Sequence, residues 1–163
     1  LGTESIQGDV AFLDVLEAMG CRVERTTESI TVTGPERLVA LDVDLSDISD
    51  QAPTFAVVAA FAEGTSTASG IGFIRRKESD RIAAVVEGLG NLGIAAAEGP
   101  DGFSITGGAP HGGRIRTFDD HRIAMSFALA GLQVPGVVID DPGCVAKTFP
   151  GFFDALDSMR APS

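Results

Sequence analysis

The sequence predicts a mixed α/β (α+β) fold built from two similar units, each with the order helix, hairpin, strand, helix and strand. Apolar side chains recur every three or four residues in several segments, which is typical of helices with one buried face. Short alternating apolar and polar runs between those segments predict strands. The pattern also repeats, because Gly20 and Gly93 end equivalent helices 73 residues apart, and Asp50 and Asp120 precede equivalent helices 70 residues apart.

The first unit spans residues 5–70. Gly20 can end its first helix in a left-handed conformation, and we expect Gly64 to end the second helix. We expect Asp50 to cap the second helix, whose first turn contains Pro53. The elements expected here are a helix over 8–19, a hairpin of strands over 21–25 and 29–33, a strand over 38–43, a helix over 51–62 and a strand over 65–69.

The second unit spans residues 71–140, and a partial third unit spans 141–163. The turn at 99–102 contains Gly, Pro and Asp and predicts a hairpin. The elements expected here are a helix around 82–89 that ends at Gly93, strands over 94–97, 103–106 and 114–117, a helix over 121–130, a buried strand over 137–139 and a final helix over 149–159 with Pro150 in its first turn. We therefore expect a chain that starts and ends inside repeats, as a fragment or a domain completed by other segments.

The composition narrows the classes of ligand. The chain has 12 Lys and Arg residues against 23 Asp and Glu residues, and its net charge of −11 repels nucleic acid and anionic membranes. No apolar run reaches about 18 residues, so no membrane span is expected. Residues 1–4 do not resemble a signal peptide. Cys21 and Cys144 lack metal-type spacing, so we expect reduced, buried thiols in a cytoplasmic protein.

Lysine is rare, and both lysines lie in polar loops beside expected helix starts. Lys77 belongs to the run Arg75-Arg76-Lys77-Glu78-Ser79-Asp80-Arg81, in which Ser79 or Asp80 can cap the following helix. A helix N-terminus with nearby cations favours phosphate or carboxylate groups. The alternative is a solvated loop with salt bridges.

Three further clusters carry residues suited to chemistry. They are the Asp119-Asp120-His121-Arg122 string, the Cys144–Pro150 segment with Lys147, and the acidic run from Asp42 to Asp50. The alternatives are an N-cap beside an exposed His and Arg, a helix entry with a solvated Lys, and an acidic loop with one N-cap. All four clusters lie between a strand and a helix, so we expect them on one face. Several cations with two or three acids there suit anionic substrates and proton transfer.

These strings together resemble the 5-enolpyruvylshikimate-3-phosphate (EPSP) synthase family. The likeness rests on Asp50 with Thr54, the 75–81 run, the string from Asp120 to Ser126, and Lys147-Thr148-Phe149-Pro150, with support from 5–9 and 15–20. It implies the enolpyruvyl transferase fold, an inside-out α/β barrel of two domains, each made of three βαβαββ units. Residues 1–163 would then form most of the C-terminal domain, with the missing N-terminal domain as partner.

The resemblance also implies a reaction. The enolpyruvyl group of phosphoenolpyruvate moves to the 5-hydroxyl of shikimate 3-phosphate with release of phosphate, and no metal or organic cofactor is required. The implied catalytic residues are Asp50 for the hydroxyl proton and Glu78, His121 and Lys147 around the methylene carbon. The implied substrate-binding residues are Arg81, Arg122 and Lys147 for phosphoenolpyruvate, and Lys77 and Asp50 for shikimate 3-phosphate. Phe73 stands where many members have Asn, and we assign it no site role.

Two other functions are alternatives to the one that the resemblance implies. The UDP-N-acetylglucosamine enolpyruvyl transferases share the fold and phosphoenolpyruvate, but the Lys77–Arg81 and Asp120–Arg122 strings argue against them. A non-catalytic anion-binding domain would not need the acids Asp50 and Glu78. We expect the isolated chain to lack turnover, because a closed, dry site needs both domains.

Overall fold

The computed structural model describes residue 5 and residues 7–159. Residues 1–4, residue 6 of the 5–9 string and residues 160–163 of the expected partial third unit lie outside this part of the chain. The helices are α1 Phe12–Ala18, α2 Ala52–Ala59, α3 Arg81–Asn91, α4 His121–Ala130 and α5 Phe152–Ser158, with 3-10 helices η1 Gly8–Ala11, η2 Ser46–Gln51, η3 Gly72–Arg76 and η4 Pro142–Lys147. The strands are β1 Arg22–Arg25, β2 Ile30–Thr33, β3 Leu38–Val39, β4 Asp42–Asp44, β5 Ala62–Glu63, β6 Thr65–Ser69, β7 Ala95–Gly99, β8 Gly102–Thr106, β9 Arg114–Ile115 and β10 Val138–Ile139.

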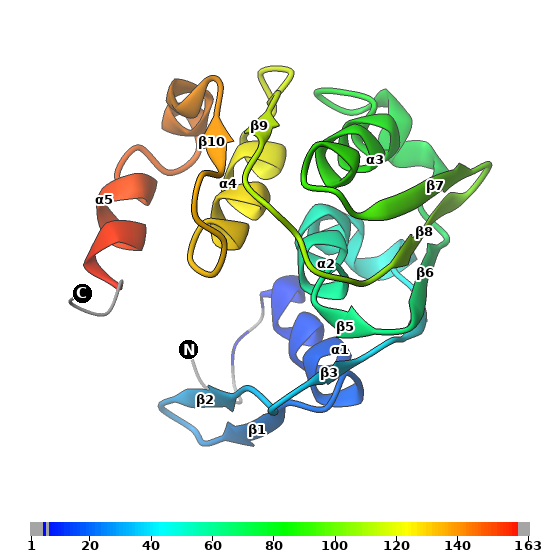
Figure 1. The fold of residues 1–163 in the computed structure, drawn as a ribbon. Helices are drawn as coiled ribbons and strands as arrows, with labels where there is room; N and C mark the ends of the chain where they lie inside the picture. The colour runs from blue at the N-terminus through cyan, green and yellow to red at the C-terminus, as the bar shows by residue number, and fades with distance from the viewer. Residues whose placement is uncertain (1–4, 6, 160–163) are drawn as a thin grey trace.

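The strands form one larger sheet and three separate pairs. The larger sheet has the order β4-β6-β8-β7, in which β4 and β6 are parallel and the other neighbours are antiparallel. The pairs are antiparallel β1 and β2, parallel β3 and β5, and parallel β9 and β10. In Figure 1 the larger sheet covers one side of α2 and α3, and α5 lies beyond α4 on the other side.

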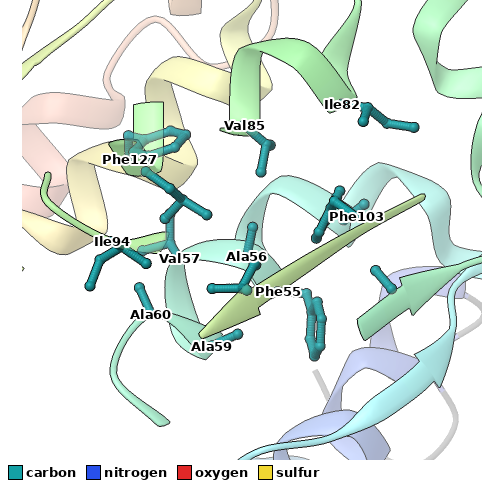
Figure 2. Close-up of a cluster of buried hydrophobic side chains, with 14 of the residues drawn as sticks. Phe55, Ala56, Val57, Ala59, Ala60, Ile82, Val85, Ile94, Phe103 and Phe127 are labelled. Atoms are coloured by element: carbon teal, nitrogen blue, oxygen red, sulfur yellow. The ribbon is translucent and has the colours of Figure 1, made fainter. Parts of the chain in front are cut away.

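The core lies between the sheet and three mutually contacting helices, α2, α3 and α4. Phe55, Phe103 and Phe127 are fully buried there, and Figure 2 shows them around α2. Helix α2 is apolar on most of its surface, which is typical of a helix enclosed on several sides. The core thus fixes the helices whose N-terminal ends carry the charged residues described below.

Helices α3 and α4 touch through a glycine. A Cβ atom added to Gly88 of α3 would lie 2.5 Å from the Cζ atom of Phe127 in α4, which is closer than carbon atoms pack. Only a residue without a side chain fits against the Phe127 ring without moving it. This contact sets the distance between the two helices.

Several expected elements are confirmed. The hairpin, the strand over 65–69 and the helix over 121–130 are present as β1–β2, β6 and α4. Gly20 and Gly93 have positive φ angles of 101° and 77°, as expected for glycines that end helices. Gly64 also has a positive φ of 106°, but it forms the turn between β5 and β6 and does not end α2, so that expectation was wrong.

Several expectations about the bounds and burial of the elements were wrong. The strand over 38–43 is interrupted, because its first part pairs with β5 and its second with β6, on either side of the Gly64 turn. The helix expected over 51–62 ends at Ala59, and Ala62 joins β5. The strand over 137–139 is not buried, since Val138 in the two-stranded pair is 43% exposed.

A further error concerns the final helix. Helix α5 begins at Phe152 with Gly151 as its N-cap residue, so Pro150 lies before the helix rather than in its first turn. The preceding 3-10 turn η4 continues through Lys147, and the Phe149 amide donates to the Val145 carbonyl. Lys147 therefore ends one helical turn instead of leading into the next.

Candidate functional site

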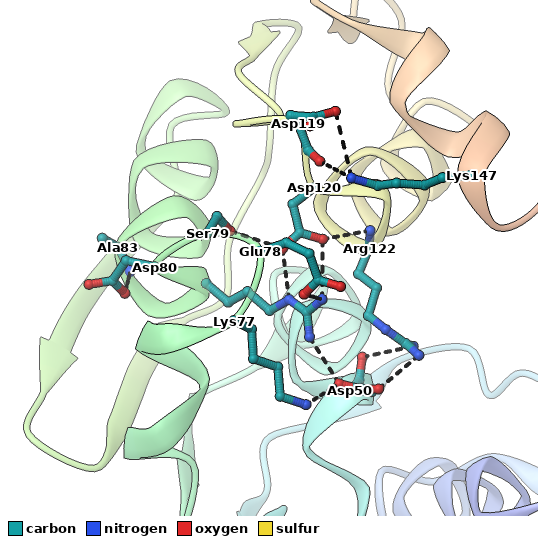
Figure 3. A network of polar contacts seen from close by, with 11 residues as sticks. Asp50, Lys77, Glu78, Ser79, Asp80, Ala83, Asp119, Asp120, Arg122 and Lys147 are labelled. Atoms are coloured by element: carbon teal, nitrogen blue, oxygen red, sulfur yellow. Dashed lines mark hydrogen bonds and ion pairs between the residues drawn. The ribbon is translucent and has the colours of Figure 1, made fainter.

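The N-terminal ends of α2, α3 and α4 meet, and their charged side chains form one cluster (Figure 3). Asp50 lies in the last turn of η2 just before α2, Lys77 and Glu78 lie between η3 and α3, and the α4 end carries two more members. The members of the charged cluster are Asp50, Lys77, Glu78, Arg81, Asp120 and Arg122. The expected convergence of these loops on one face is confirmed for these six residues.

A fully buried ion pair joins α3 to α4. Arg81 Nε donates to Asp120 Oδ2 at 2.8 Å and Nη2 lies 3.3 Å from Oδ1, while the two residues are 1% and 0% exposed. Asp120 is also the N-cap residue of α4, accepting a hydrogen bond from the Arg122 amide, and it accepts another from the Ser79 hydroxyl. Burial raises the pKa of Asp120, but the Arg81 guanidinium and these donors outweigh it, so the pKa lies below its ordinary value.

Three cations converge on Asp50. Its Oδ1 atom lies 2.6 Å from Lys77 Nζ and 2.9 Å from Arg81 Nη1, and its Oδ2 atom lies 2.8 Å from Arg122 Nη2. Burial raises the pKa of Asp50, but the hydrogen bond from Lys77 and the charges of the three cations lower it further, so the net pKa is below the ordinary value. The expected cap role of Asp50 is wrong, because no side chain caps α2 and this carboxylate is held by the cations.

Glu78 is the most exposed acid of the cluster. It lies three residues before Arg81, and its Oε2 atom accepts a hydrogen bond from Arg81 Nη2 at 2.6 Å. The Glu78 side chain is 42% exposed, whereas that of Arg81 is 2% exposed. Arg81 therefore links the buried Asp120 to two carboxylates that a ligand can reach, those of Asp50 and Glu78.

His121 begins α4 and is buried to all but 8% of its surface. Among the described residues its Nδ1 atom has no hydrogen-bond partner. Burial lowers the pKa of His121, and although Asp120 and Glu78 oppose this, the net pKa stays below the ordinary value of 6.5. His121 is therefore neutral at pH 7.

The low pKa of His121 predicts a pH-dependent stability. As the pH falls from 6.5 toward the lowered pKa of folded His121, the unfolded chain takes up a proton there that the folded chain does not, so the free energy of unfolding falls by up to about 1.4 kcal/mol per pH unit. Asp50 and Asp120 change the free energy of unfolding only at lower pH, as the pH falls from the ordinary aspartate value of 3.8 through their lowered pKa values. Urea unfolding at several pH values should show this slope in wild type and lose it in His121→Gln. His111→Gln, which changes the exposed histidine, should keep it, and an unchanged slope in His121→Gln would contradict the assignment.

Lys147 stands beside the charged cluster rather than inside it. Its ammonium group donates to the Asp119 carbonyl and lies 3.6 Å from Asp119 Oδ1. Phe118 and Asp119 both have left-handed backbones, with φ of 55° and 57°, which is costly for a bulky residue such as Phe118. This strained turn places Asp119 toward Lys147 and Asp120 toward Arg81.

For Arg75 and Asp120 the structure differs from the main expectation. Arg75 pairs with Asp80 and Glu98, so the salt-bridged loop that was the alternative for the 75–81 run holds for Arg75. Asp120 was expected only as a cap, and the structure shows it also as the buried partner of Arg81.

Other candidate chemistry is limited within the described part of the chain. Cys21 and Cys144 are buried free thiols, as expected, and burial raises the pKa of each. No group of three His, Cys, Asp or Glu side chains there is arranged to hold a metal ion. No helix over these residues has the length and apolar character that crossing a membrane requires.

The family can be assigned from a family model, which describes EPSP synthase (3-phosphoshikimate 1-carboxyvinyltransferase) and matches residues 1–156. The chain belongs to the EPSP synthase family. The expected resemblance is therefore confirmed.

Curated relatives in the EPSP synthase family span most of this chain. A 3-phosphoshikimate 1-carboxyvinyltransferase of Nostoc punctiforme is 48% identical over 98% of this chain and 37% of the relative. A chloroplastic protein of the same name from Brassica napus is 46% identical over 97% of this chain and 32% of the relative. The chain thus spans about a third of the length of these relatives.

Solved structures of the family confirm the expected fold class. An EPSP synthase from Acinetobacter baumannii has a TM-score of 0.83 and 29% identity, covering 97% of this chain and 40% of that one. The enolpyruvyl transferase NikO from Streptomyces tendae has a TM-score of 0.76 at 23% identity, which shows the shared fold. The mixed α/β arrangement is thus that of the enolpyruvyl transferases.

Proposed function

We propose that this chain is part of a 3-phosphoshikimate 1-carboxyvinyltransferase, a transferase of aromatic amino-acid biosynthesis, and that its charged cluster holds phosphoenolpyruvate and shikimate 3-phosphate. The observation that carries the proposal is the convergence of Lys77, Arg81 and Arg122 on one carboxylate, that of Asp50. Guanidinium groups grip carboxylate and phosphate groups through paired hydrogen bonds. The names of the relatives supply the substrate class.

Asp50 is the anion that Lys77, Arg81 and Arg122 contact in this chain, and a substrate anion would compete with it for the same cations. While the three cations surround it, its low pKa makes it a weak base. A phosphate or carboxylate that binds Arg81 and Arg122 weakens the hold of these cations on Asp50, and its pKa rises. Substrate binding thereby prepares Asp50 to take the proton from the 5-hydroxyl of shikimate 3-phosphate, which Lys77 contacts.

The second proton transfer takes place at the methylene carbon of phosphoenolpyruvate. Glu78 is the exposed acid beside Arg81, and neutral His121 and cationic Lys147 follow on the α4 side. In this proposal Glu78 gives and later retakes the proton, and the nearby cations stabilise the charge that develops on the intermediate. In this proposal the Lys147 ammonium group leaves Asp119 and contacts the substrate.

The remaining part of the site comes from a second domain. In this proposal residues 1–163 form most of the C-terminal domain of a cytoplasmic enzyme, with repeats over 5–70, 71–140 and 141–163. The charged cluster of this chain is partly exposed, as the Glu78 and Asp50 side chains show at 42% and 35%. A second domain that closes over it would exclude water, so we expect no turnover by this chain alone.

A chimaera tests the proposed function. The chain should replace the matching 37% of the Nostoc punctiforme relative and retain release of phosphate from the two substrates. Mutation of Arg122 to Met should reduce kcat/KM by about 100-fold, because one guanidinium group that binds the substrate anion is lost. A folded chimaera that binds phosphate without turnover would instead support the anion-binding alternative.

A further inference from the structure

The turn between β7 and β8 is hydrogen-bonded to the loop that leads into the charged cluster. The Gly70 and Gly72 amides donate to Asp101 Oδ2 and Oδ1, each at 3.0 Å, and the Ile71 amide between them donates to the Asp101 carbonyl at 3.0 Å. Three consecutive backbone donors thus end on one residue. Asp101 lies in the sequence far from the site and was not among the expected functional residues.

Glycines allow this close approach. A Cβ atom on Gly72 would lie 3.0 Å from Asp101 Oδ1, and one on Gly102 would lie 1.8 Å from the Ala68 carbonyl oxygen. Gly70 has a φ of 74°, which side chains rarely adopt. The backbone of the turn therefore lies directly against the end of β6 and the start of η3.

The anchored loop leads straight to Lys77 and Glu78. The Ile74 amide donates to the Ile71 carbonyl, and the Lys77 amide donates to the Ile74 carbonyl. Arg75 adds a second link to the same hairpin, because its guanidinium donates to the Gly99 carbonyl and Glu98. Lys77 itself has non-helical backbone angles, with φ of −86° and ψ of −145°, so no helix of its own fixes its position.

We propose that Asp101 is a positioning residue for the charged cluster, acting through the amides of residues 70–72 to place Lys77. The other members have anchors of their own, because Asp120 holds Arg81, Arg81 in turn holds Glu78, and Arg122 belongs to α4. Loss of the Asp101 carboxylate should therefore disturb the acceptor side of the site more than the phosphoenolpyruvate side. This division rests on the proposed function.

The test is Asp101→Ala in the full-length polypeptide that contains this chain. We expect kcat/KM for shikimate 3-phosphate to fall about 10-fold to 100-fold, with a raised KM for that substrate and a nearly unchanged KM for phosphoenolpyruvate. Asp101→Asn keeps one oxygen acceptor for two amides and should lie between Ala and wild type. Equal changes in both KM values, or none, would overturn the proposal.

A matched control separates positioning from general loss of hairpin stability. Thr106→Val removes the hydrogen bond between Thr65 and Thr106 at the opposite end of the same hairpin. It should lower Tm without changing either KM, and kinetics that match those of Asp101→Ala would overturn the proposal.

Hydrogen exchange provides a readout that needs no activity. In Asp101→Ala, peptides that cover residues 70–80 should exchange their amide hydrogens faster than in wild type, and in Thr106→Val they should not. If wild type has no turnover, the proposed function fails while this measurement still decides the role of Asp101. Unchanged exchange in Asp101→Ala would overturn that role.

Discussion

Replacing Arg81 with Met should lower the free energy of unfolding by about 3 kcal/mol, the largest effect on stability expected at this site. Removing one partner of a buried ion pair usually costs about 3–5 kcal/mol, because the other charge stays buried without compensation. Asp120 keeps two donors, the Ser79 hydroxyl and the Arg122 amide, so we expect the lower end of that range. Urea unfolding with linear extrapolation measures the change.

Two variants test the cause of this loss. Arg81→Lys should also destabilise, because an ammonium group cannot reproduce the two-atom contact with Asp120. The double variant Arg81→Met with Asp120→Leu removes both charges and should be more stable than Arg81→Met alone. A loss below about 1 kcal/mol in Arg81→Met would show that the buried Asp120 charge is already compensated.

Changing Asp50 to Asn should have opposite effects on turnover and on anion binding. Turnover should fall by about 100-fold to 10,000-fold, because the proposed base for the hydroxyl proton is gone. Affinity for inorganic phosphate should rise about tenfold, because Lys77, Arg81 and Arg122 lose the carboxylate that competes with the ligand. Steady-state kinetics and calorimetry on the full-length polypeptide measure the two quantities.

Asp47→Asn is the matched control for Asp50. Asp47 is an exposed acid in the same run of carboxylates, three residues earlier, and its replacement should change neither quantity. If phosphate affinity falls together with turnover in Asp50→Asn, the carboxylate supports the cations rather than competing with a ligand.

The sequence predicted what local chemistry determines. Helix α4 spans the expected residues 121–130 with Asp120 as its N-cap residue, and β6 matches the expected strand. The gathering of Asp50, Glu78 and Arg81 also followed, because loops between strands and helices of repeated units lie at the same end. These inferences needed only spacing and residue type.

The remaining features depend on contacts between distant parts of the chain. Arg81 and Asp120 are 39 residues apart, and nothing near either one indicates that their charges are buried together. The left-handed Phe118 carries no glycine signal, since tertiary packing holds it there. The strand over 38–43 is interrupted because its two partners, β5 and β6, are separated by a turn of their own.

The contact between Gly88 and Phe127 acts as a pivot for the charged cluster. Gly88 lies seven residues after Arg81 and Phe127 lies seven residues after Asp120, so each helix extends about 10.5 Å from the contact to the ion pair. A methyl group at residue 88 would push α3 and α4 apart and lengthen the Arg81–Asp120 contact at the N-terminal ends of the two helices. A glycine two helical turns away thus controls the spacing of the buried Arg81–Asp120 ion pair.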